Sequence, residues 1–138
     1  MNSRRGACAC GGVRYSIDGT LRQIIACHCE QCRRSSGHFV AATAARRDNF
    51  HLLRSDTLRW YSAIPGFRRG FCSSCGSSLF FERVGEDRMS IAAGSLDDAR
   101  GLEIAAHIFV AEAGSYYEVD DDVENAAGGQ CSVSMPPK

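Results

Sequence analysis

Cys27-His-Cys-Glu-Gln-Cys32 places three cysteines within six residues, and this stretch organises the rest of the chain. Such a density of thiols is typical of a metal site, because thiolates are the preferred ligands of zinc and other soft metals. Four of the other five cysteines form two pairs, Cys8 with Cys10 and Cys72 with Cys75. Cys131 stands alone near the C-terminus and has no assigned role.

The grouping of the cysteines into two, three and two predicts two metal sites of different kinds. A structural zinc has four protein ligands, whereas a catalytic zinc has three and keeps one position for water or substrate. Combining the triplet with either pair would give five thiolates for four positions and would leave the other pair without a metal site. We therefore predict a closed structural zinc site and an open, reactive one, with the respective ligands Cys8, Cys10, Cys72, Cys75 and Cys27, Cys29, Cys32.

His28 is a poor candidate for a further ligand of the open site. If Cys27 and Cys29 face the metal from an extended segment, His28 points the other way. A packing role, or one in orienting the ligands, is favoured over ligation. Residues 29–35 are expected to form one helical turn that ends at Ser35-Ser36-Gly37.

The remaining pattern indicates a mainly β fold with one or two short helical turns. Val13, Tyr15 and Ile17 alternate with polar residues, as in a strand with one buried face. Other short segments rich in β-branched and aromatic residues predict strands over 7–10, 21–27, 38–45, 49–54, 57–62, 67–72, 78–83, 88–93 and 105–111, and a helical turn over 96–99.

Length and charge limit the classes of partner. A chain of 138 residues suits one domain, which we place at residues 1–124, followed by a flexible tail over 125–138. The formal net charge of zero gives no case for nucleic-acid binding, and pairs of arginines such as Arg68-Arg69 are expected to be solvated surface. Without an apolar run for a membrane span or a secretory signal, we expect a cytoplasmic protein whose cysteines bind metal rather than form disulfides.

The cysteine motifs resemble those of the glutathione-dependent formaldehyde-activating enzyme family. The similarity covers roughly residues 6–123 and rests on the ordered motifs Cys8-Ala-Cys-Gly-Gly-Val-Arg-Tyr15, Cys27-His-Cys-Glu-Gln-Cys-Arg-Arg-Ser-Ser-Gly37, Phe71-Cys-Ser-Ser-Cys-Gly76, Ala93-Gly-Ser-Leu-Asp-Asp98 and His107-Ile-Phe-Val110. It implies a twisted, mostly antiparallel, zinc-stabilised fold of the β-tent type. It also implies a carbon–sulfur lyase in which the triplet holds a catalytic zinc and glutathione and formaldehyde combine to S-hydroxymethylglutathione.

Three interpretations stay open for the substrate and for the function. Departures from the family pattern at Ala113, Tyr116 and Glu124 leave the identity of the thiol substrate undecided. The rivals to the named reaction are the same chemistry on a different thiol adduct and a non-catalytic zinc module that acts as a scaffold. A homo-oligomer is compatible with the sequence.

The residues that follow the triplet are the candidates for substrate contacts. One hypothesis is that donors beside the triplet hold a substrate carboxylate. The alternative is that these side chains cap the helical turn or lie on the surface. The residues concerned are Arg33, Arg34, Ser35 and Ser36. His107, on an apolar strand, is expected to be a core residue.

Overall fold

Strands with one buried face build the molecule, as the alternation of apolar residues predicts. The computed structural model describes residues 3–137. In β2 (Val13–Asp18) the side chains of Val13, Tyr15 and Ile17 are buried, and those between them are exposed or half-buried. The prediction for this strand is confirmed.

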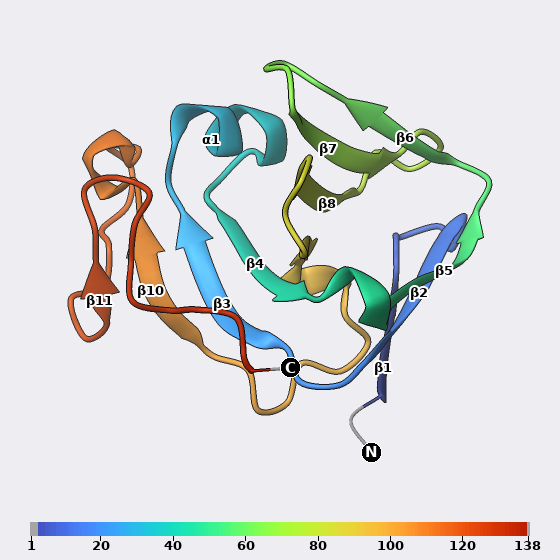
Figure 1. Ribbon diagram of the computed structural model, residues 1–138. Helices are drawn as coiled ribbons and strands as arrows, with labels where there is room; N and C mark the ends of the chain where they lie inside the picture. The colour runs from blue at the N-terminus through green and yellow to red at the C-terminus, as the bar shows by residue number, and fades with distance from the viewer. Residues whose placement is uncertain (1–2, 138) are drawn as a thin grey trace.

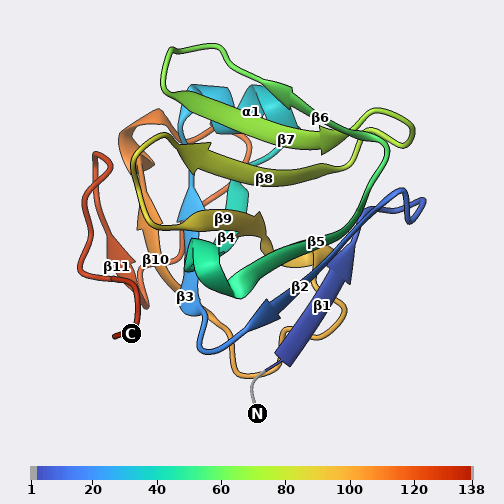
Figure 2. The same ribbon diagram turned by 45° about the vertical axis from the view of Figure 1, so that its right-hand side comes forward.

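Over residues 3–137 the strands form two sheets, which Figures 1 and 2 show from two sides. The smaller sheet has the order β1 (Ser3–Ala7), β2, β5 (Phe50–Ser55). The larger sheet has the order β11 (Glu124–Asn125), β10 (Ile104–Ile108), β3 (Arg22–Cys27), β4 (Val40–Ala45), β9 (Met89–Ala92), β8 (Ser78–Arg83), β7 (Phe67–Cys72), β6 (Leu58–Tyr61).

Helical structure is brief, and the mainly β prediction is confirmed. The α-helix α1 spans Glu30–Ser36, where one helical turn was expected. Short 3-10 helices cover Arg47–Asn49, Ala93–Ser95 and Val110–Glu112. The helical turn expected over 96–99 is wrong by a few residues, because Leu96 instead forms a β-bridge with Gly6.

Most strand pairs are antiparallel, and β10 is the exception. It pairs parallel with both β3 and β11, so the larger sheet is mixed. Between β9 and β10 the chain passes beyond β4 and β3, so β10 meets β3 through a crossover rather than a hairpin and runs parallel to it. This crossing places Ile108 of β10 beside Cys27 of β3.

The core lies between the two sheets. Tyr15 of β2 meets the ring of Phe80 of β8 edge-on at a centroid separation of 5.3 Å, and its hydroxyl lies 2.6 Å from the Ser95 hydroxyl. Each such aromatic pair adds about 1 kcal/mol beyond the burial of its area. The core thus joins the smaller sheet to β8 and to the 3-10 helix that follows β9.

A bulge in β3 changes which residues face the concave side of the larger sheet. The register against β4 shifts between Arg22 and Ile25. Because of this shift Arg22 lines the same cleft as Ile25 and Cys27, although strict alternation would place residues 22 and 25 on opposite faces.

The segment after residue 124 lies along β10. The N–H of Phe109 donates to the carbonyl of Gly128 at 2.8 Å, and the Arg46 guanidinium donates to the carbonyl of Pro136 at 2.7 Å. The division into a domain over 1–124 and a flexible tail over 125–138 stays a prediction.

Candidate functional site

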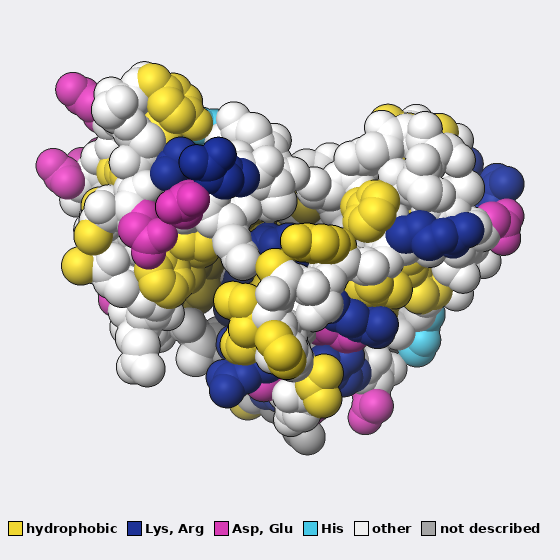
Figure 3. Space-filling view, turned by 90° about the horizontal axis from the view of Figure 1, so that it is seen from above, with side chains coloured by type: hydrophobic (Ala, Val, Ile, Leu, Met, Phe, Trp, Pro, Cys, Tyr) yellow, Lys and Arg dark blue, Asp and Glu magenta, His cyan; other side chains and the backbone are white. Residues whose placement is uncertain are grey.

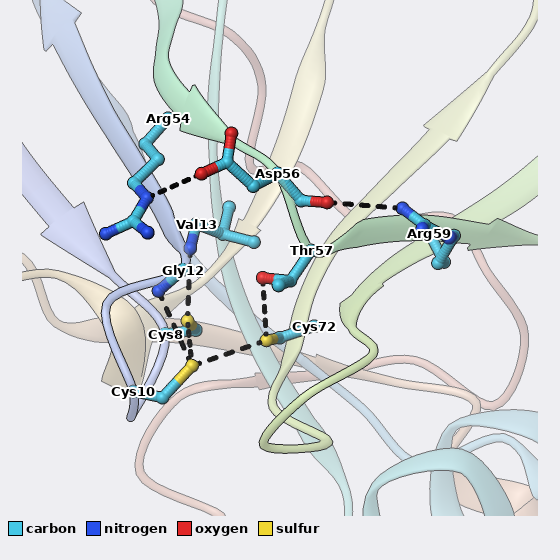
Figure 4. Close-up of polar contacts among 9 residues, drawn as sticks. All are labelled: Cys8, Cys10, Gly12, Val13, Arg54, Asp56, Thr57, Arg59 and Cys72. Atoms are coloured by element: carbon cyan, nitrogen blue, oxygen red, sulfur yellow. Dashed lines mark hydrogen bonds and ion pairs between the residues drawn. The ribbon is translucent and has the colours of Figure 1, made fainter.

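Four cysteines come together where two turns meet. Cys8 and Cys10 lie in the turn after β1, and Cys72 and Cys75 lie at the end of β7 and in the turn that follows it. All four Sγ atoms lie within 4.8 Å of one another. Cys10 Sγ is 3.7 Å from both Cys8 Sγ and Cys72 Sγ, and dashed lines mark these two contacts in Figure 4. A tetrahedral zinc with bonds of about 2.3 Å separates its sulfurs by about 3.8 Å, so this four-cysteine cluster fits zinc.

The expected extended segment around the first pair is wrong. Cys8 N–H donates to the Val13 carbonyl at 3.1 Å, and Gly11 N–H donates to the Cys8 carbonyl at 3.2 Å, so the chain folds back on itself there. Gly11 has φ +79°, a conformation that favours glycine. A turn rather than a strand brings the two sulfurs to one side.

Hydrogen-bond donors surround the sulfurs of the four-cysteine cluster. The N–H groups of Gly12 and Val13 donate to Cys10 Sγ and Cys8 Sγ at 3.4 and 3.3 Å. Thr57 Oγ1 lies 3.1 Å from Cys72 Sγ, and these donors are drawn in Figure 4. The hydroxyl and the N–H of Ser77 lower the pKa of Cys75 to about 5. Such contacts favour thiolates, which are the form that binds metal.

The cysteine triplet lies where β3 passes into α1. Cys27 ends β3, Cys29 is the N-cap residue of α1, and Cys32 is buried in its first turn. The three Sγ atoms lie within 4.8 Å of one another, and Cys29 Sγ accepts a hydrogen bond from the Cys32 N–H at 3.3 Å. Gly37 ends the helix with φ +89°. Three thiols in reach of one point could hold a metal and leave a fourth position free.

Arg69 of β7 is a member of this site that the sequence did not indicate. Its Nη2 lies 3.6 Å from Cys32 Sγ, and its guanidinium stacks over the ring of Phe81 at 5.0 Å. Hydrogen bonding from the thiols of Cys27 and Cys32 lowers the pKa of Cys29, and the positive charge of Arg69 acts in the same direction. The treatment of Arg68-Arg69 as solvated surface is wrong for Arg69, because β7 turns this side chain toward α1.

The four residues proposed for substrate contacts are mostly engaged with the chain itself. Arg34 pairs with Glu30 at 2.9 Å, and the Arg33 guanidinium donates to the carbonyl of Glu112 at 3.2 Å. The hydroxyls of Ser35 and Ser36 both donate to the Cys32 carbonyl. These bonds match the capping alternative, and a contact of these residues with substrate stays a prediction.

The ring nitrogens of His28 belong to neither group of sulfurs that could hold a metal. It is buried, and its two ring nitrogens lie 2.7 Å from the Tyr117 hydroxyl and 2.8 Å from His107 Nδ1. Burial lowers the pKa of His28 to about 4, with a further contribution from His107. Both nitrogens are engaged, so a packing role suits His28 better than ligation, and His107 is buried as expected.

The triplet opens into a cleft of about 910 Å³ on the concave side of the larger sheet. Its walls come from β3, β4, strands β6 to β10, α1 and the segment after residue 128, which brings Cys131 to the cleft. Six arginines and three glutamates line it. Figure 3 looks onto a face hollowed between two raised parts, with arginines and apolar side chains in the hollow. A cleft of this size and charge suits a small anionic molecule.

Comparison with known proteins agrees with this arrangement. A crystal structure of a Rhodobacter sphaeroides protein is similar with a TM-score of 0.57 and 22% identity, over 70% of this chain and 91% of that one, which supports the fold. No curated protein matches significantly. Over the residues that the structure describes, no helix is long and apolar enough to span a membrane. The family model for "Glutathione-dependent formaldehyde-activating enzyme" matches residues 3–112, and the chain therefore belongs to this family.

Proposed function

We propose that this protein is a zinc-dependent carbon–sulfur lyase that joins glutathione to formaldehyde and gives S-hydroxymethylglutathione. The observation that carries the proposal is the difference between the two groups of cysteines. All three cysteines of the triplet line the cleft, whereas none of the four in the other cluster does so among the residues described. An incoming thiol therefore reaches the triplet, and the four-cysteine cluster suits a structural zinc.

The reaction balances without an oxidant or a reductant. The thiol of glutathione loses its proton, its sulfur bonds to the carbon of formaldehyde, and the carbon–oxygen double bond becomes a single bond whose oxygen takes up a proton. Zinc held by Cys27, Cys29 and Cys32 would supply the chemistry of ionising a thiol at its fourth position. Three thiolates leave such a site with one net negative charge, which makes it suited to thiols rather than to activating water.

The surrounding residues have separate roles in this proposal. Arg69 holds positive charge beside Cys32 and compensates the thiolates. The N–H of Cys32 fixes the position of Cys29 Sγ, and Gly37 ends the helix so that β4 can begin. The arginine-lined cleft attracts glutathione, which carries two carboxylates and one amine. The eight free cysteines support a reducing compartment, and we propose the cytoplasm.

The test combines zinc content with turnover. Zinc-loaded protein should contain two zincs per chain and should accelerate the exchange between glutathione, formaldehyde and their adduct, followed by NMR. Cys29→Ser should lose one zinc and the acceleration while staying folded. Cys131→Ser, which removes a cysteine outside both groups, is the control for zinc content and should keep both ions.

Other outcomes would support the rival interpretations. Two bound zincs without acceleration for any small thiol would refute the lyase proposal and favour a scaffolding module. Acceleration with another thiol, and none with glutathione, would refute only the identity of the substrate.

A further inference from the structure

Five of the six arginines that line the cleft already have a partner of opposite charge or a thiol. Arg34 pairs with Glu30, Arg68 with Glu82, and Arg83 and Arg88 both with Glu86. Arg69 lies against Cys32 Sγ. Within residues 3–137, the sixth arginine, Arg22, forms no ion pair with a carboxylate, and the group of the cleft whose charge favours its protonated form is Cys131.

Arg22 is also the most deeply placed of these arginines. Only 6% of its surface is exposed. Its Nη2 donates to the carbonyl of Ala42 at 2.8 Å, and its Nε donates to the carbonyl of Gln23 at 3.1 Å. Burial and, to a smaller extent, the charge of Arg88 lower the pKa of Arg22 to about 10, and Cys131 acts in the opposite direction. A buried guanidinium without a carboxylate partner is costly, and an anionic ligand would reduce that cost.

The bulge in β3 gives this side chain its position. The register shifts between Arg22 and Ile25, and the guanidinium bonds across to the carbonyl of Ala42, which is the β4 partner of Ile25. A guanidinium has five N–H donors, and the two bonds to carbonyls use two of them. Donors therefore remain for a ligand in the cleft, and a planar carboxylate is the best match to this group.

The distance along the sheet fits a cysteinyl peptide. Ala42, which the guanidinium contacts, pairs with Ile25, and Cys27 pairs with Val40. The guanidinium thus lies two residues along the strands from the level of Cys27, or about 7 Å. In glutathione one residue, glycine, separates the cysteine from a terminal carboxylate, which is a comparable span.

We propose that Arg22 is the residue that binds the glycine carboxylate of glutathione while its thiol is at the cysteine triplet. This inference rests on the proposed function, because it takes the substrate to be a thiol with a carboxylate one residue away. The competing explanation is that Arg22 only fills the bulge with hydrogen bonds.

The experiment measures binding without the aldehyde, by calorimetry on zinc-loaded protein. The ligands are glutathione, its glycine ethyl ester and cysteamine, a thiol without a carboxylate. The unchanged protein should bind glutathione at least about tenfold more tightly than the ester, since a charge-assisted bond is lost in the ester. Arg22→Gln keeps an N–H donor for the bulge, and it should bind glutathione and the ester with equal, weaker affinity.

Cysteamine and a matched variant separate binding from folding. Arg22→Gln should bind cysteamine as the unchanged protein does, and Arg59→Gln, which alters an exposed arginine outside the cleft, should bind all three ligands normally. Equal losses of glutathione and cysteamine affinity in Arg22→Gln would overturn the inference in favour of a role in the bulge. Unchanged glutathione affinity in that variant, or no preference of the unchanged protein for glutathione over the ester, would overturn it as well.

The inference and the proposed function fail in different ways. Binding of glutathione that depends on Arg22, without any turnover of formaldehyde, would refute the lyase and leave the carboxylate site in place. Turnover with glutathione binding that is independent of Arg22 would refute the carboxylate site alone.

Discussion

Replacing Arg69 by methionine should weaken zinc binding at the triplet and leave the four-cysteine cluster unchanged. The guanidinium Nη2 lies 3.6 Å from Cys32 Sγ. Zinc binding to three thiols releases their protons and leaves the site with one net negative charge, and two unit charges at about this separation attract by about 1 kcal/mol in water and by about 5 kcal/mol at the effective dielectric constant of a protein site. Arg69 is half-buried, so the lower part of this range applies, and zinc affinity should fall at least about fivefold.

The assay is competition for zinc with a chelator whose own zinc affinity is known, which resolves the two sites. Methionine keeps an unbranched apolar side chain over the ring of Phe81, so the variant removes charge with little loss of packing. Arg59→Met, an exposed arginine outside the cleft, is the matched control. If the triplet binds zinc with the same affinity in the Arg69→Met variant and in the control, the argument that Arg69 compensates the thiolates is refuted.

Three further substitutions test the packing and the electrostatics of the fold. Gly6→Ala would place a Cβ 2.2 Å from the Tyr15 hydroxyl and should destabilise the protein by about 1–3 kcal/mol in urea unfolding, whereas Gly94→Ala, with no atom within 4 Å, should have little effect. The bonds of Glu82 to two arginines outweigh its burial and lower its pKa below 4.5, so stability should fall as the pH drops below about 4.5, and Glu82→Gln should flatten this dependence in acid unfolding. Thr57→Val removes the hydroxyl beside Cys72 Sγ and should weaken the zinc affinity of the four-cysteine cluster by about tenfold in chelator competition.

Local patterns in the sequence predicted most of the strands and the grouping of the cysteines. Strand alternation located β2 and most other strands, and counting thiols separated Cys8, Cys10, Cys72 and Cys75 from the triplet, as the structure also does. The same reasoning wrongly placed Cys8 and Cys10 on a strand, because alternation gives no sign that the chain turns back through Gly11.

Sequence periodicity alone did not place the arginines of the cleft beside the cysteines. Arg69 approaches Cys32 from a strand 37 positions further along the chain, and only the sheet order brings the two together. Arg22 faces the cleft because of a bulge, and a bulge shifts the side-chain alternation without a sequence signal of its own. Residues 67, 69 and 71 do share one face of a strand, which was the available hint for Arg69.

The two groups of cysteines differ in how much of the chain each one ties together. Cys10 and Cys72 lie 62 positions apart, in the turn after β1 and at the end of β7, and so belong to different sheets, whereas the triplet spans six residues. Closing the longer loop restricts the unfolded chain more, by about 2 kcal/mol on a logarithmic dependence on loop length. A metal in the four-cysteine cluster therefore joins the sheets, and a metal in the triplet fixes only the start of α1.

This difference predicts that Cys72→Ser and Cys29→Ser will have unequal effects on stability, although each removes one thiol. Cys72→Ser should lower the midpoint of thermal unfolding much more, because it releases β7 and the β1–β2 turn from each other. It also puts a serine hydroxyl at a position that is fully buried. Cys29→Ser should keep cooperative unfolding near the midpoint of the unchanged protein, since serine can also accept the Cys32 N–H bond as an N-cap. Similar losses in the two variants, measured in zinc-loaded protein under reducing conditions, would contradict the division into one cluster that holds the fold and one that is free for chemistry.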